Sequence, residues 1–118
     1  MPHVYKDAFL SIDSDQAKLL NPFRKDQQRM LTFKDWKAED LQSIKAPALI
    51  VVSDQDVVRP EHAIEMIHLL PHGRLAILPG GHGAFIGEAM SPNPNSKVPE
   101  LAVAMFEEFL NEDMPELK

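Results

Sequence analysis

The sequence contains no cysteine and few basic residues. The absence of cysteine excludes disulfide bonds, thiolate nucleophiles and cysteine-ligated zinc sites. Lys and Arg never occur in a run longer than two, and the formal net charge is −6. Because affinity for nucleic acids depends on clustered Lys and Arg, we expect no nucleic-acid partner.

Long hydrophobic segments are also missing. No apolar run approaches the ~20 residues that a membrane-spanning helix needs. The first residues, "MPHVYKDAFL", lack the basic region and the apolar core of a signal peptide. Hydrophobic residues make up 44% of the chain and charged residues 25%, which is typical of folded domains. We therefore expect a soluble cytoplasmic protein that does not associate with membranes.

Residues 1–35 are mostly polar, with isolated apolar side chains. The segment "NPFRKDQQRML" predicts a helix in which Asn21 caps the free N–H groups and Pro22 takes the first helical position. A short second helix is predicted over 37–44. Trp36, just before it, is predicted to bury its ring in the core.

The pattern changes after Pro47. The continuous apolar run at 48–52 is typical of a strand covered on both faces, as in parallel sheets. A helix over 60–70, a strand over 74–79 and a last helix over about 97–111 follow, which predicts an α/β fold with a βαβα order and parallel strands. A sheet of two strands is too small to bury both of its faces. We therefore expect this region to be the end of a larger sheet.

Acidic and basic side chains follow the two predicted strands. Asp54 and Asp56 come after the first strand, and His82 comes after the second, in a turn rich in glycine. Open parallel sheets place their active sites at this carboxyl edge. A carboxylate beside a histidine fixes the ring tautomer and stabilises the imidazolium, which suits general-base catalysis. The βαβ order therefore brings the Asp56 and His82 loops side by side. On spacing alone, a solubilising loop role stays open for Asp56, and a loop or capping role fits Asp54.

Two segments together resemble the C-terminal part of the α/β-hydrolase superfamily: "IKAPALIVVSDQDVVRPEHA" and "LAILPGGHGAFIGE". Such proteins carry an apolar strand followed by "GDxD", then a helix, a strand and "LPGgGH". The resemblance covers roughly 36–110, and Ser53 stands where the family usually has glycine. It implies that Asp56 is the triad acid, that His82 is the triad base, and that no cofactor is needed. It also implies that residues 1–35 are the end of a helical cap and that residues 36–118 are the C-terminal part of the hydrolase core.

The nucleophile of that family is missing from the sequence. It lies in a G-x-S-x-G turn before the acid and the histidine, whereas every glycine here lies at or after Gly73 and no serine stands in such a turn. We therefore expect a C-terminal fragment of a hydrolase that cleaves an ester or related bond of a small molecule, with its serine outside this chain. The piece alone should be inactive. The alternative is a non-catalytic, self-associating or binding module, and the unpaired edge of the first strand predicts a dimer.

Two further pairs of residues could take part in ligand binding. Phe85 and Ile86 follow His82 and could line a substrate pocket or pack against the last helix, and the sequence leaves both open. His68 and His72 have a spacing that suits metal binding on a helix. Pro71 and Gly73 would break that helix, so no metal site is expected.

Overall fold

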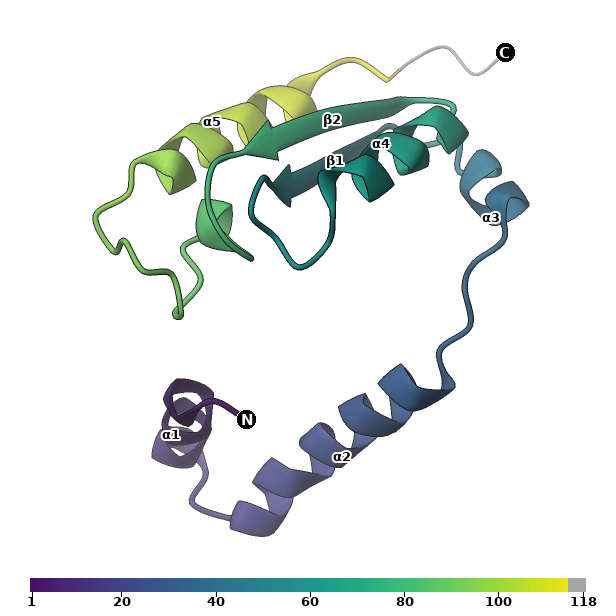
Figure 1. The fold of residues 1–118 in the computed structure, drawn as a ribbon. Helices are drawn as coiled ribbons and strands as arrows, with labels where there is room; N and C mark the ends of the chain where they lie inside the picture. The colour runs from purple at the N-terminus through teal and green to yellow at the C-terminus, as the bar shows by residue number, and fades with distance from the viewer. Residues whose placement is uncertain (115–118) are drawn as a thin grey trace. The chain divides into compact units, whose positions relative to one another are not determined.

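A computed structural model describes residues 1–114 of the chain. The chain divides into two compact units, the first over Met1–Asp35 and the second beginning at Trp36. The first unit contains two helices, and the second contains both strands and the other helices (Figure 1). No helix in residues 1–114 is long and apolar enough to cross a membrane.

The first unit consists of α1 (His3–Ile12) and α2 (Gln16–Thr32). The expectation that Asn21 caps a helix is wrong, because Asp15 does so earlier in the chain. Its carboxylate accepts the backbone N–H groups of the next turn, which are the donors that a helix start leaves free. Pro22 lies inside α2 instead of at its start, and its missing N–H removes one helical hydrogen bond.

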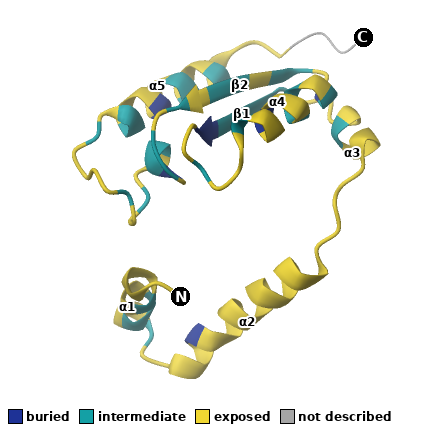
Figure 2. Cartoon of the chain, viewed as in Figure 1, coloured by how far each residue is buried: buried dark blue, intermediate teal, exposed yellow. Residues whose placement is uncertain are grey.

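Little of the first unit is buried. Leu19 is its one buried hydrophobic residue, and most of α2 is exposed in Figure 2. The large apolar side chains that are exposed in this unit are Met1, Val4, Tyr5, Ile12, Leu20, Phe23, Met30, Leu31 and Phe33. Because hydrophobic stabilisation is proportional to the apolar area removed from water, these two helices gain little stability from their own packing.

The second unit has the predicted order of strand, helix, strand and helix. Its elements are α3 (Ala38–Gln42), β1 (Ala48–Ser53), α4 (Pro60–Leu69), β2 (Gly73–Leu78), a short 3₁₀ helix η1 (Ala84–Ile86) and α5 (Val98–Asn111). β1 and β2 form a parallel pair whose register runs from Ala48 opposite Gly73 to Ser53 opposite Leu78. The predicted α/β class and the parallel pairing are therefore confirmed.

The sheet of the second unit lies between two helices (Figure 1). α4 packs against both strands. Met105 and Phe109 of α5 line a small hollow together with Leu49 and Leu75 of the strands. The buried hydrophobic residues come from β1, from both helices and from the end of the α4 segment: Val52, Ala63, Leu70 and Ala102.

Trp36 does not join this core. The residue is 71% exposed, so the predicted burial of its ring is wrong. The residue lies in the extended segment between α2 and α3. Within residues 1–114, that segment has no hydrogen-bonded partner strand.

Candidate functional site

The loops that follow β1 and β2 leave the sheet side by side. Because the strands are parallel and end in register, both loops start at the carboxyl edge of the sheet. Pairing continues past the strand ends: the N–H of Asp54 donates to the carbonyl of Leu78 at 2.8 Å, and that of Gln55 donates to the carbonyl of Gly80 at 3.0 Å. These bonds fix the two loops relative to each other.

Asp56 and His82 meet at this edge. His82 Nδ1 lies 2.8 Å from Asp56 Oδ1, although the two residues are 26 positions apart in the chain. The carboxylate side chain is only 7% exposed, whereas the imidazole is 70% exposed. The acid is thus shielded by the protein while the ring faces solvent, as a base that must meet a reacting group requires.

The charge state of Asp56 sets the tautomer of the ring. The hydrogen bond from His82 lowers the pKa of the Asp56 carboxyl below its usual value, and the backbone N–H of Val58, at 3.3 Å, acts in the same direction. An ionised carboxylate can only accept hydrogen bonds, so the proton of neutral His82 is on Nδ1. Nε2 then keeps its lone pair, and within residues 1–114 it makes no hydrogen bond. Such a nitrogen can remove a proton from a hydroxyl group.

A glycine turn carries His82. Gly80 has a φ of +129°, and a Cβ there would lie 2.7 Å from the Cβ of Ala84. Gly83 has a φ of +67°, and a Cβ there would come within 3.0 Å of Glu88. Both positions therefore require glycine. Gly81, between them, has open space around the position of a Cβ.

This difference predicts that Gly80→Ala is much more disruptive than Gly81→Ala. Strain and the contact with Ala84 should lower the free energy of unfolding by about 1–3 kcal/mol for Gly80→Ala. Gly81→Ala should stay within about 0.5 kcal/mol of the wild type. Urea unfolding followed by circular dichroism measures both values. Equal effects of the two substitutions would contradict the backbone geometry of this turn.

Ser53, at the end of β1, is fully buried. Its Oγ makes no hydrogen bond to any residue that the structure describes. A buried hydroxyl without a partner destabilises a protein by about 1–3 kcal/mol. The Ser53 hydroxyl therefore makes no hydrogen bond that would stabilise the Asp56 loop in the described structure.

We therefore expect Ser53→Ala to leave the protein as stable as before or to stabilise it by about 1 kcal/mol, because the unpaired group is removed at nearly constant volume. Chemical unfolding of the wild type and the variant measures the difference. A loss of more than about 1 kcal/mol would show that Oγ has a partner that stabilises the fold.

Phe85 and Ile86 follow the histidine in η1. The Phe85 ring packs edge-on against Phe106 of α5, with centroids 6.4 Å apart and planes at 85°. Ile86 is 66% exposed. Phe85 thus anchors the histidine loop to α5, and a role of either residue in substrate binding stays a prediction.

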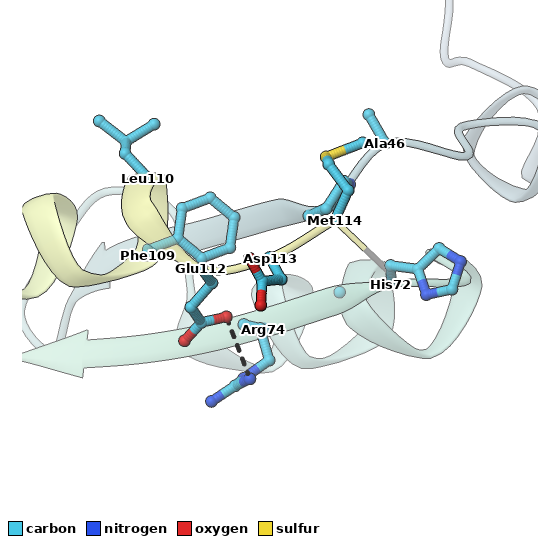
Figure 3. A pocket seen from close by; sticks show the side chains of 10 residues that line it. Ala46, His72, Arg74, Phe109, Leu110, Glu112, Asp113 and Met114 are labelled. Atoms are coloured by element: carbon cyan, nitrogen blue, oxygen red, sulfur yellow. Dashed lines mark ion pairs between the residues drawn. The ribbon is translucent and has the colours of Figure 1, made fainter. Parts of the chain in front are cut away.

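A cavity of about 420 Å³ lies at the other end of the sheet, where the strands begin (Figure 3). Arg74 and Glu112 form an ion pair of 3.8 Å beside it. The residues lining the cavity come from the starts of the strands and the end of α5: Ala46, Pro47, His72, Gly73, Arg74, Phe109, Leu110, Glu112, Asp113 and Met114. Neither Asp56 nor His82 lines it, so this cavity is not the site of the acid–histidine pair.

The residues considered as metal ligands do not form a cluster. His68 lies near the end of α4 and His72 lies in the turn before β2. Within residues 1–114, no group of three or more His, Asp or Glu side chains is placed to hold a metal ion.

Comparison with known protein families, with curated proteins and with solved structures finds no match for this chain. The resemblance to α/β-hydrolases therefore depends on the two sequence motifs alone. Asp54, which bridges the two loops, is the residue at this edge whose contact sequence reasoning missed.

Proposed function

We propose that this chain carries the acid and the base of a Ser-His-Asp triad in a hydrolase that cleaves an ester or related bond of a small molecule. The observation that supports this most is the 2.8 Å contact between Asp56 Oδ1 and His82 Nδ1. A shielded acid and an exposed imidazole at the carboxyl edge of a parallel sheet agree with the roles that the motifs imply. The chemistry uses proton transfer and a covalent acyl intermediate, and it needs no cofactor.

In this proposal His82 moves protons and Asp56 supports it. Nε2 takes the proton of the serine hydroxyl while the serine oxygen attacks the carbonyl carbon of the substrate. Asp56 stabilises the imidazolium that forms. Nε2 then gives the proton to the leaving alcohol, and a water activated by the same nitrogen releases the acid product.

The serine nucleophile is assigned to a segment outside these 118 residues. Within the described residues, no serine hydroxyl makes a hydrogen bond to His82. Ser53 is buried, whereas Ser11 and Ser43 donate to nearby backbone carbonyls, both at 2.7 Å. Ser96 accepts the N–H of Val98 at the start of α5. None of these four serines donates a hydrogen bond to His82 Nε2.

Hydrolysis of a p-nitrophenyl ester tests the assignment. The 118-residue chain should show no saturable turnover, because an imidazole without a nucleophile and oxyanion donors gives only weak, non-saturating catalysis. A form of the protein that also contains a G-x-S-x-G segment should turn over the ester and should be inactivated by one equivalent of a phosphonate. Saturable turnover by the 118 residues alone would overturn the assignment of the nucleophile.

The sheet edge favours a second candidate, a self-associating module. The N–H of Ala48 donates to the carbonyl of His72, and that of Asp54 donates to the carbonyl of Leu78. Alternation along the strand therefore directs the backbone groups of Leu49 and Val51 to the side away from β2. β1 has no charged residue and no proline to protect this edge.

We accordingly expect the 118-residue chain to dimerise through β1 at micromolar concentrations. Val51→Pro removes an N–H on the open side and should give a monomer that still melts cooperatively, whereas Ile50→Pro should unfold the protein because its N–H belongs to the β1–β2 ladder. Light scattering at several concentrations measures the mass. A wild-type mass of 13.3 kDa at all concentrations would contradict association.

A further inference from the structure

We infer that Asp54 is a positioning residue: its carboxylate holds the histidine turn on the acid loop and so sets the geometry of the Asp56–His82 pair. Asp54 Oδ1 accepts the backbone N–H of Gly80 at 2.9 Å, across 26 positions of sequence. Only the consequence of this contact for catalysis rests on the proposed function. The contact itself is a property of the fold.

The carboxylate replaces a bond of the parallel ladder. The register of the strands would pair Asp54 with Pro79, and the backbone carbonyl of Asp54 would then accept the N–H of Gly80. In the structure the side-chain oxygen takes this donor instead. Because the side-chain oxygen accepts this N–H in place of the backbone carbonyl, the chain after β2 can leave the ladder at Gly80, whose φ of +129° begins the turn.

The position of this contact links it to the site. Asp54 precedes Asp56 by two residues, and Gly80 precedes His82 by two residues. A second hydrogen bond, from the Gln55 N–H to the Gly80 carbonyl at 3.0 Å, holds the peptide group on the other side of the same glycine. Gly80 is thus tied by its N–H and its C=O to the loop that carries Asp56. Loss of the carboxylate removes one of these two hydrogen bonds and so widens the range of positions that His82 samples.

The tautomer ratio of His82 depends on the geometry of the Asp56–His82 pair, and it can be measured in a protein that has no catalytic activity. In the whole 118-residue chain, long-range proton–nitrogen NMR at alkaline pH measures the ratio of the Nδ1–H to the Nε2–H form of the neutral ring. Asp56→Ala supplies the value for a ring without its acceptor. We expect Asp54→Ala to lower the ratio about 2-fold to 10-fold, which is the effect of weakening one hydrogen bond. Asp54→Asn should restore the wild-type ratio, because its Oδ1 still accepts from Gly80.

Asp40→Ala is the matched control. Asp40 is also exposed, and its carboxylate accepts the backbone N–H of Lys37 at 3.1 Å, but it lies at the start of α3. This variant should keep the wild-type ratio. An unchanged ratio in Asp54→Ala would overturn the inference, as would an equal change in Asp40→Ala or a failure of Asp54→Asn to restore the ratio.

Amide exchange in the wild type gives a second test that does not depend on any variant being folded. The N–H of Gly80 should exchange with water at least about 3-fold more slowly than that of Gly81, because only the former has an acceptor in the described structure. Equal rates would overturn the inference. If the ratio and the exchange behave as expected but no hydrolase activity is found, the positioning role stands and the proposed function falls.

Discussion

Replacement of His82 by alanine should lower ester turnover by about 10³-fold or more in a form of the protein that also contains the serine nucleophile. A serine hydroxyl is a weak nucleophile unless a base removes its proton. The shielded carboxylate of Asp56 already orients the His82 ring. The loss should appear in kcat, because the imidazole acts in the transition state and contributes little to substrate binding. Steady-state kinetics measure it.

His62→Ala is the control for this experiment. His62 is another exposed histidine with a carboxylate nearby, since its Nδ1 lies 4.0 Å from Glu65 on α4. Its substitution should leave kcat unchanged. Because the His82 ring is 70% exposed, its removal should not unfold the protein, and a matching thermal melt verifies this. Near-normal turnover of His82→Ala would remove this residue from the mechanism.

Asp56→Asn should reduce turnover about 10³-fold to 10⁴-fold, far more than Asp54→Asn. An amide at position 56 can donate to Nδ1 and hold the ring in the wrong tautomer, and it carries no charge to stabilise the imidazolium. Asn at position 54 keeps an oxygen that accepts the Gly80 N–H, so the loss there should be less than about 10-fold. The kcat values of the two variants, measured in parallel, give the comparison.

The two substitutions control for each other, because both convert an aspartate of the same loop to its isosteric amide. If Asp54→Asn proves the more damaging, then the acid of the pair is Asp54 and the assignment is displaced by two residues. The 2.8 Å contact of Asp56 with His82 argues against that outcome.

The second unit could be predicted well because its signals are local and strong. Ala48–Val52 is continuously apolar, and the helix after it begins at a proline in its first turn, so the strand, the helix and their boundaries followed directly. The meeting of Asp56 and His82 followed from topology, since parallel strands that end in register bring their next residues to one edge.

The first unit was harder to predict. α1 was missed, because its start has no side-chain cap hydrogen bond and no acidic residue lies in its first turn. α2 was placed too late because Asn21-Pro22 has the form of a helix start, whereas the Asp15 carboxylate satisfies the free N–H groups first. Two competing start signals within one helix cannot be ranked from local sequence alone.

The environments of two side chains could be found only from the three-dimensional structure. Trp36 is an aromatic residue of the kind that cores usually bury, but it lies in the segment between α2 and α3 and is exposed. The Asp54 carboxylate accepts the N–H of Gly80, where the chain after β2 turns at a positive φ. No periodicity in the sequence encodes a bond between two loops.

The central claim is that Asp56 and His82 activate a serine nucleophile, and phosphonate labelling with mass spectrometry tests it most directly. A fluorophosphonate reacts with serines that a histidine base has activated. In the protein that contains this chain and its nucleophile segment, we predict a stoichiometric adduct on a serine in a G-x-S-x-G turn, and a rate of labelling at least about 10³-fold lower in His82→Ala. No adduct with His82 intact, or equal labelling rates in the wild type and His82→Ala, would contradict the account.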